Sequence, residues 1–339
     1  MIEAHTLDAW TRAADRTTLA FRDLTILGGF AAPLFLLLAG VTTVLSAERT
    51  TRETSGRRAA AGICRRGLQI FALAFLFRLQ AFVVSPGGPA IAILKVDILN
   101  VMGPAVAAVG VVWAFGRSWG ARIVALAALT AAVGMVTPAV HAAEWVNAVP
   151  LWLQWYIRPA GAQTTFTMLP WCGFLFAGAA GGMLLSNIPA PSNLSNLLVL
   201  VGSGLGLLIV GFYTATLPTI YRSSLFWTSS PTFFAIRTGA LVMALVLAYV
   251  VQALLRAAPV WLRFLERFGR RSLFVYWIHV ELVYGYATWA IHRRLSLVQT
   301  ALAFLLFCLA MYWAVVLRDR VASWWRMRQA GGAVQPVHA

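Results

Sequence analysis

The sequence predicts an all-α protein, a polytopic bundle of transmembrane helices. Hydrophobic residues make up 60% of the chain and charged residues 11%, with a mean hydropathy of +0.77, whereas a soluble domain carries about 25% charged residues. Several apolar runs reach the roughly 20 residues that a helix needs to cross hydrocarbon. These runs lack the alternation that is typical of membrane-barrel strands. We therefore expect an integral membrane protein that crosses the bilayer as helices.

Nine apolar segments follow one another along the chain, and each is predicted to be a membrane helix. They cover residues 24–46, 67–85, 96–115, 122–141, 166–187, 196–218, 235–255, 272–291 and 297–317. No repeat or long polar insertion separates them, so we expect one transmembrane domain over 1–320 and a basic tail over 321–339.

Arginine is concentrated in two of the connections, 47–66 and 256–271, and in the C-terminal tail. The positive-inside rule places these segments in the cytoplasm and residues 142–165 outside. This clustering accounts for the net charge of +16 without a nucleic-acid partner. The strong preference for arginine over lysine is typical of GC-rich bacterial genomes, so we expect the bacterial inner membrane.

The first residues, "MIEAHTLDAW", resemble the outer end of a helix whose earlier turns are missing. An odd number of helices places residues 1–23 outside, and no earlier apolar segment carries them across. We therefore expect a tenth helix before them, and the alternative is a short tail that crosses unaided.

Four ionisable residues lie within the apolar runs: Arg78, Asp97, His279 and Glu281. A charge at the centre of a membrane helix costs about 2.5–3.5 kcal/mol on insertion scales, so such residues usually face a partner or a cavity. Arg78 and Glu281 lie about 16 and 14 Å into their predicted helices, which predicts that they pair. The alternative is that the pair only fixes helix packing.

Histidine supplies the candidate acid–base groups. His279 and Glu281 are about 200° apart around their helix, so each needs a partner from another helix. His5 is predicted at the outer face, where its ordinary pKa of about 6.5 suits proton transfer from a sugar hydroxyl or amine. Asp97, at a matching depth, is expected to orient it. The alternatives are a structural interior His279, a His5 in a frayed terminus, and an Asp97 that stays at the membrane surface.

Five blocks carry a family resemblance: "MIEAHTLDAW", "GGFAAPLFLLLAGV", "VDILNVMGPAV", "TMLPWCGFLFAGAAGG" and "GRRSLFVYWIH". Together and in this order, they resemble the bacterial branch of the heparan-alpha-glucosaminide N-acetyltransferase catalytic-domain family. The resemblance implies a membrane acetyltransferase that moves an acetyl group from cytoplasmic acetyl-CoA to a saccharide on the opposite face. It also implies that His5 is catalytic, and it draws attention to Asp97 and His279.

If acetyl-CoA is the co-substrate, its phosphates should meet cations at the cytoplasmic mouth. Arginine suits phosphate because of its planar fork of donors. The candidate residues are Arg57, Arg58, Arg65, Arg66, Arg270 and Arg271. The alternative for each is simple positive-inside topology. We expect a polar path from these arginines past His279 to His5, membrane lipid as the surroundings, a saccharide as acceptor and no metal ion.

A transporter or proton-coupled permease is the rival class, because it would also explain Arg78, Glu281 and His279 inside the membrane. Transporters commonly show inverted repeats or paired broken helices, and the sequence shows neither. The sequence leaves open the acceptor's identity, O- or N-transfer and the oligomeric state.

Overall fold

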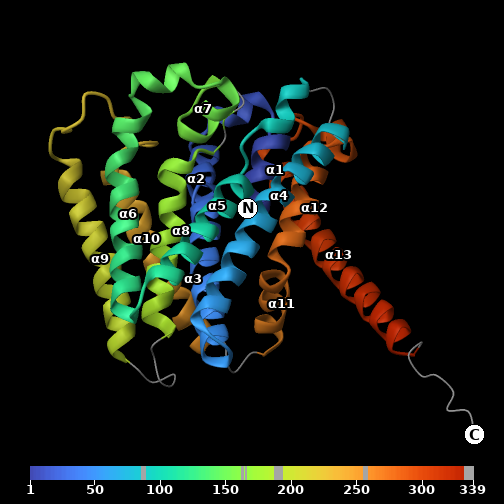
Figure 1. Ribbon diagram of the computed structural model, residues 1–339. Coiled ribbons are helices and arrows are strands. Elements are labelled where there is room, and N and C mark those ends of the chain that lie inside the picture. Colours follow the sequence, from blue (N-terminus) through green and yellow to red (C-terminus); the bar gives the residue numbers. More distant parts are fainter. Residues whose placement is uncertain (85–88, 162–163, 165, 187–193, 255–258, 332–339) are drawn as a thin grey trace, which may run out of the picture. The chain divides into compact units, whose positions relative to one another are not determined.

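The computed structural model describes residues 1–84, 89–161, 164, 166–186, 194–254 and 259–331. Within these ranges the chain is built of α-helices joined by short 3₁₀ turns, and no strand is formed apart from two isolated bridges (Figure 1). The helices are α1 (Ile2–Trp10), α2 (Leu19–Gly28), α3 (Ala31–Glu53), α4 (Gly56–Val84), α5 (Ile98–Phe115), α6 (Trp119–His141), α7 (Leu151–Ile157), α8 (Met168–Ser186), α9 (Leu194–Ala215), α10 (Pro231–Leu254), α11 (Pro259–Arg270), α12 (Ser272–Tyr284) and α13 (Leu297–Gly331).

Eight stretches of the described chain are long and apolar enough to cross a membrane, with α2 and α3 counted as one stretch, and α12 is a shorter apolar helix. Each of the nine predicted segments contains one of these helices. The predicted all-α, multi-pass architecture is confirmed.

Several helix ends differ from the prediction. The first segment is divided between Gly28 and Ala31 into α2 and α3, and α12 ends at Tyr284 instead of residue 291. Helix α4 begins at Gly56, eleven residues before its predicted start at 67. Its added turns, "RRAAAGICRR", contain strong helix formers. Because the segment is rich in arginine, hydropathy alone predicted a loop there. Arg78 therefore lies near the far end of α4, and its estimated depth of about 16 Å was wrong.

Two stretches predicted as connection and tail are also largely helical. The connection after α10 contains α11, and α13 continues past the predicted boundary at residue 320 to Gly331. Residues 332–339 of the predicted tail lie outside the described residues. The division into a domain over 1–320 and a tail stays a prediction.

The chain forms two compact units: residues 1–28, 84–86 and 252–339 make up unit 1, and residues 29–83 and 87–251 make up unit 2. In unit 2, α8 packs along α3 and α6 (Figure 1). Gly40 and Gly178 lie where α3 and α8 cross, and a Cβ atom on either would collide with the backbone of the other helix. The small-residue stretch "GAAGG" is therefore a helix-packing feature here, as close backbone approach in membranes requires.

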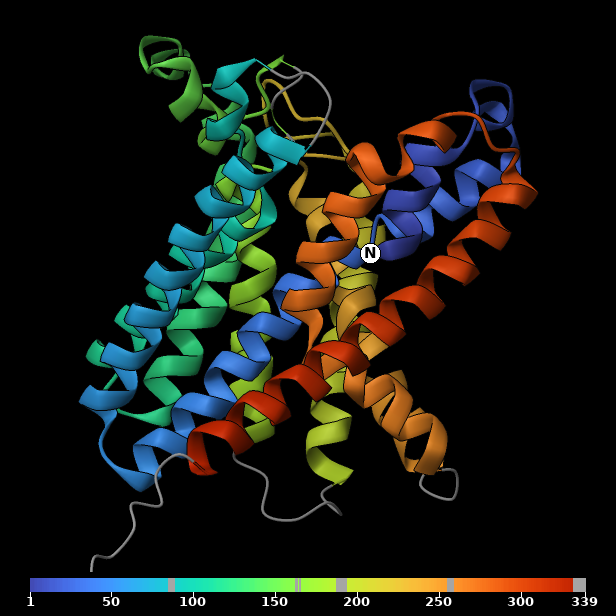
Figure 2. The same ribbon diagram turned by 90° about the vertical axis from the view of Figure 1, so that its right-hand side faces the viewer.

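In unit 1, α1 packs against α12 and α13. Trp10 is 2% exposed and forms a small core with Ala9 and Val283. Just beyond α1 the backbone bonds to the segment that precedes α13: Leu295 N–H donates to the Trp10 carbonyl at 3.0 Å, and Arg12 N–H donates to the Leu295 carbonyl at 2.8 Å. Figure 2 shows the start of α13 beside this part of the chain. These contacts hold α1 in a defined position beside α12.

Candidate functional site

Two histidines meet inside unit 1. His5 on α1 and His279 on α12 have ring centroids 5.2 Å apart. His279 is 1% exposed, whereas His5 is half-buried. The two residues are 274 positions apart in the chain, and the packing of α1 on α12 brings them together. Both were candidate site residues in the sequence.

A hydrogen-bonded chain links His5 to a carboxylate. Tyr284 Oη donates to Asp8 Oδ2 at 2.9 Å, and His5 Nδ1 lies 3.2 Å from the same Tyr284 oxygen. A phenol has one hydrogen, and Asp8 receives it, so the phenol oxygen accepts from His5 Nδ1–H. This arrangement leaves His5 Nε2 with a free lone pair, which is the form that a general base requires.

His279 is held by its own helix. Its Nδ1–H donates to the Val275 carbonyl at 2.6 Å, and its ring meets that of Tyr276 edge to face at 5.9 Å. Its Nε2 atom is buried, and no group among the described residues forms a hydrogen bond with it. The second imidazole of the pair therefore also presents an unprotonated nitrogen.

Arg78 and Asp97 form an ion pair in unit 2. Arg78 Nη2 lies 3.2 Å from Asp97 Oδ2, and the side chains are 18% and 6% exposed. Asp97 also caps α5: its Oδ1 accepts from Ile98 N–H at 2.6 Å, and its backbone N–H donates to Asn100 Oδ1 at 2.9 Å. Asn100 Nδ2 donates in turn to Tyr156 Oη at 3.1 Å. Asp97 is therefore buried as a helix cap and ion-pair partner.

Two predicted pairs join residues of different units: Arg78 with Glu281, and Asp97 with His5. Both pairs, and the polar path from the arginines to His5, stay predictions. Glu281 is buried, at 8% exposed. Within unit 1 the carboxylate connected to His5 is that of Asp8, through Tyr284.

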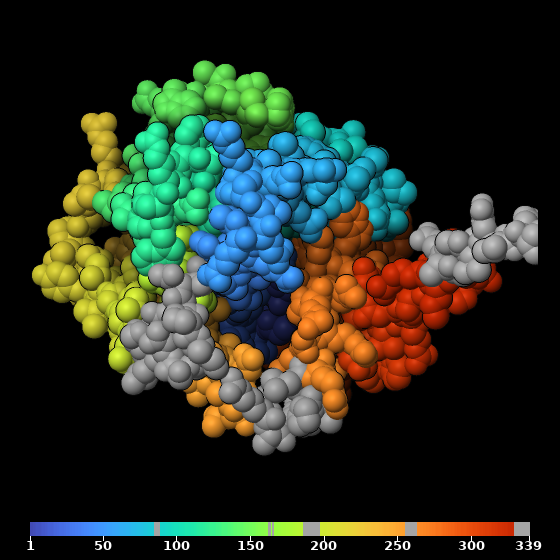
Figure 3. All heavy atoms as spheres, turned by 60° about the horizontal axis from the view of Figure 1, so that its bottom comes forward, coloured from blue at the N-terminus to red at the C-terminus, as the bar shows by residue number. Residues whose placement is uncertain are grey.

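The candidate phosphate ligands fall into two groups. Arg57, Arg58, Arg65 and Arg66 lie on α4 with exposed side chains, and none takes part in the ion pairs found among the described residues. Figure 3 shows the turn between α3 and α4 at the surface. In unit 1, Arg270 is paired with Glu266, and Arg271 Nε lies 2.9 Å from Asp319 Oδ1. The α4 group thus has more capacity for an external anion.

A pocket of about 370 Å³ lies beside that turn, between α3 and α4. Arg58 and Arg66 line one wall, and hydroxyl side chains of α3 line the other. These hydroxyl residues are Thr42, Thr43, Ser46 and Thr50. The threonine hydroxyls donate to carbonyls of their own helix, so their oxygens remain available as acceptors.

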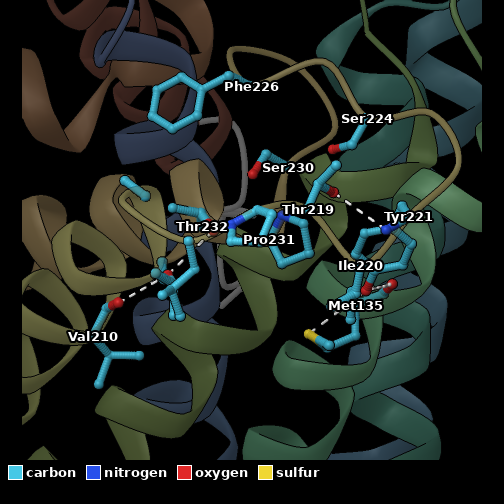
Figure 4. Close-up of a pocket in the computed structure, with 15 residues that line it drawn as sticks. Met135, Val210, Thr219, Ile220, Tyr221, Ser224, Phe226, Ser230, Pro231 and Thr232 are labelled. Atoms are coloured by element: carbon cyan, nitrogen blue, oxygen red, sulfur yellow. Dashed lines mark hydrogen bonds between the residues drawn. The ribbon is translucent and has the colours of Figure 1, made fainter.

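Another cavity, of about 400 Å³, lies elsewhere in unit 2, among α6, α9, α10 and the chain between α9 and α10 (Figure 4). Tyr221 Oη donates to the Met135 carbonyl at 2.7 Å, and the hydroxyls of Thr214 and Thr232 lie 3.2 Å apart. Its lining residues include no Asp, Glu, His, Lys or Arg. The cavity therefore offers no charged acid–base group.

Comparison with known families identifies the class of protein to which this chain belongs. Residues 1–203 of the 339-residue chain match the family model described as heparan-alpha-glucosaminide N-acetyltransferase, catalytic. The chain belongs to this family. No curated protein matches the chain. The match places the chain among membrane acetyltransferases and includes His5 and Asp97, whereas α12 with His279 lies beyond it. Among the described residues, no group of three His, Cys, Asp or Glu side chains could hold a metal ion.

Sequence reasoning missed the role of Tyr284 beside His5. Asp8 follows His5 by three residues, a spacing that puts both on one face of α1, so its nearness could have been expected. Tyr284 ends the same apolar helix that carries His279. Its meeting with α1 depends on which helices are neighbours, and the apolar pattern does not contain that information.

Proposed function

We propose that this member of the acetyltransferase family moves an acetyl group from cytoplasmic acetyl-CoA to a saccharide on the opposite face of the bacterial inner membrane. His5 is the general base. The observation that carries the proposal is the hydrogen-bonded chain of Asp8, Tyr284 and His5, which supports an imidazole with an unprotonated Nε2. An acid–base histidine is the group that acyl transfer near neutral pH requires.

The proposed reaction balances as follows. The acceptor's hydroxyl or amine attacks the thioester carbonyl of acetyl-CoA while His5 Nε2 takes its proton. The carbon–sulfur bond then breaks, and the thiolate of CoA leaves with the electron pair. The imidazolium returns the proton to the thiolate. The products are an acetyl ester or amide and the free thiol of CoA.

Asp8 and Tyr284 act through His5. The Asp8 carboxylate holds the hydrogen of the Tyr284 phenol, and the phenol oxygen holds His5 Nδ1–H. This arrangement selects the reactive tautomer and stabilises the imidazolium that forms during transfer, as the carboxylate of a catalytic triad does. Both are therefore positioning residues.

The donor binds in the pocket between α3 and α4. Arg58 and Arg66 supply charge for the phosphates of CoA, because guanidinium groups form strong charge-assisted bonds to phosphate. The threonine hydroxyls that line the opposite wall offer acceptors for the amide N–H groups of the pantetheine arm. The Arg-rich end of α4 is the cytoplasmic end by the positive-inside rule.

Membrane vesicles of one orientation test the whole proposal. Acetyl-CoA with a labelled acetyl group is added on the α3–α4 side, and a mixture of saccharide acceptors is placed on the other side. We expect label to appear in the saccharide while acetyl-CoA and the released CoA stay on the α3–α4 side. Solute flux without acetyl transfer would support the transporter class instead.

The donor pocket has its own test. Arg58→Ala and Arg66→Ala should each raise the KM for acetyl-CoA about tenfold or more, the effect of one lost hydrogen bond to a charged group, with little change in kcat. Arg49→Ala is the matched control, because Arg49 lies exposed on α3, pairs with Glu53 and does not line the pocket. An equal rise in KM for the Arg49 variant would refute the assignment of this pocket.

A further inference from the structure

A second polar pocket of unit 2 lies near the other end of α3. It has a volume of about 120 Å³ and is lined by His141 of α6, Trp171 of α8 and Arg237 of α10. Arg237 Nη2 donates to the Gly29 carbonyl at 2.8 Å, just before α3 begins. The donor pocket is lined by α3 from Thr42 to Thr50, so one pocket lies towards each end of this membrane-spanning helix.

Arg237 is a half-buried cation without an anionic partner among the described residues. None of the ion pairs in the described ranges involves it, and its Nε atom is buried without a hydrogen-bond partner among those residues. Its guanidinium lies 5.0 Å from the centroid of the Phe233 ring and 5.8 Å from that of Trp171. A cation in a membrane helix is costly unless it is paired or faces a cavity, and Arg237 lines one.

The site is within reach of water at the end of the bundle. Arg237 is six residues into α10, which begins at Pro231, so it lies about 9 Å from the end of that helix. His141 is the last residue of α6. A charged group of a water-soluble molecule can therefore approach the guanidinium from the membrane surface.

The rest of the lining suits a sugar. Trp227 lines the pocket and is 66% exposed, so its ring is accessible to a ligand. The Thr167 hydroxyl and His141 Nε2 both donate to the Leu169 carbonyl, so the Thr167 oxygen remains an acceptor for a ligand's hydroxyl. Thr228 adds a second hydroxyl. Aromatic walls with a few placed polar groups are typical of small-molecule sites.

We infer that this pocket binds the negatively charged group, carboxylate or phosphate, of an anionic saccharide. Arg237 holds the anion, the tryptophans contact the ring, and the threonine oxygens accept from its hydroxyls. The inference deepens the proposed function and rests on it for the statement that this saccharide is the acetyl acceptor. The binding itself does not depend on acetyl transfer.

The test is direct binding to the purified protein in lipid nanodiscs, without acetyl-CoA, followed by tryptophan fluorescence and calorimetry. The probes are glucuronic acid, glucose 1-phosphate, glucose and inorganic phosphate. We expect one of the two charged sugars to bind at least about thirtyfold more tightly than glucose, the effect of one buried charge pair. Arg237→Gln should abolish this preference, and Arg237→Lys should retain part of it.

Arg222→Gln is the matched control. It removes the same charge from an exposed position of the connection between α9 and α10, outside the pocket lining, and should keep the preference. Trp227→Ala alters an exposed side chain. It should weaken the binding of all the sugars while the protein stays folded, so it tests the site even if Arg237→Gln fails to fold.

Equal binding of glucose and both charged sugars would overturn the inference. So would inorganic phosphate binding as tightly as glucose 1-phosphate, or an unchanged preference in Arg237→Gln. Specific binding with no acetyl transfer would leave this site standing and refute the proposed function.

Discussion

Two buried polar clusters, one in each unit, use their hydrogen-bonding groups in opposite ways. In unit 2, Asp97 engages both carboxylate oxygens, one with Arg78 and one with the backbone of α5. In unit 1, His279 keeps a buried Nε2 that no described residue contacts, and the bond from Nδ1 to Tyr284 leaves His5 Nε2 free to accept a proton. Both clusters consist of ionisable residues in apolar helices.

The difference indicates which cluster is structural and which is reactive. A carboxylate whose oxygens are all engaged stabilises the helices it joins, because removing it would leave a buried cation unpaired. A buried nitrogen without a partner lowers stability, and a catalytic role is one explanation for keeping it, although Arg78 Nε in unit 2 is also buried without a partner among the described residues. We therefore propose that Asp97 is a stability residue and that the histidine pair is the reactive centre.

The largest expected effect is on catalysis. His5→Ala should lower acetyl transfer by about 10²- to 10⁴-fold, the usual contribution of a general base, while thermal stability and acetyl-CoA binding change little. Transfer of labelled acetyl groups and a melting curve measure the two effects. His292→Ala is the control, because His292 is another histidine of unit 1, and its ring stacks on Trp289 and not on the histidine pair. Near-normal transfer by the His5 variant would move the catalytic assignment to His279.

The second prediction concerns stability in unit 2. Arg78→Ala or Asp97→Ala should each lower the free energy of unfolding by about 3 kcal/mol or more, since either change strands a buried charge. The double change should cost less than the sum of the two, which a double-mutant cycle measures. Asp97→Ala should in addition lose the cap of α5.

A second cycle with Arg78→Ala and Glu281→Ala sharpens the comparison. Coupling in both cycles would mean that Arg78 interacts with both carboxylates, and it would confirm the predicted pair of Arg78 and Glu281. Additive effects in the Asp97 cycle would contradict the ion pair described here. Lost acetyl transfer in Asp97→Asn, at unchanged stability, would restore Asp97 as the residue that orients His5.

The sequence anticipated the fold better than the contacts. The number and order of the long apolar segments follow from apolar length alone, which is why all nine are present, whereas the short helices α7 and α11 were not predicted. The start of α4 was missed because its first turns are helical but polar. The position of Arg78 along α4 was therefore misjudged as well. His5 and His279 were predicted as site residues from chemistry and from the family resemblance; the structure brings their rings together, and their catalytic role stays a prediction. The hydrogen bond from His5 to Tyr284 was not predicted, because it depends on which helices are neighbours.

The third prediction separates positioning from catalysis. Tyr284→Phe removes the oxygen that holds His5 Nδ1–H and should lower kcat about 10- to 100-fold, as the loss of a supporting partner does elsewhere, with little change in KM. Asp8→Asn should act in the same direction but less, because it leaves the phenol in place. The measurement is kcat across pH for both variants. A purely structural role for Tyr284 would lower stability and leave kcat per folded molecule unchanged.

The smallest expected effect concerns Asp15, beyond the histidine cluster of unit 1. Its Oδ2 accepts from Leu297 N–H at 2.7 Å, at the start of α13, and its Oδ1 accepts from Arg12 Nε at 2.9 Å. The backbone bond from Leu297 and then the bond from Arg12 lower the pKa of Asp15 below its ordinary value. A lowered pKa in the folded state means that the contribution to stability is complete above the unfolded-state value, about pH 4, and is lost as the pH falls through the lower folded-state value. Hydrogen exchange at the first turn of α13 should therefore become faster, relative to the rest of the helix, on acidification below about pH 4. Asp15→Asn should already show the faster exchange at neutral pH and should not change further, and an acid response that persists in this variant would assign it to another carboxylate.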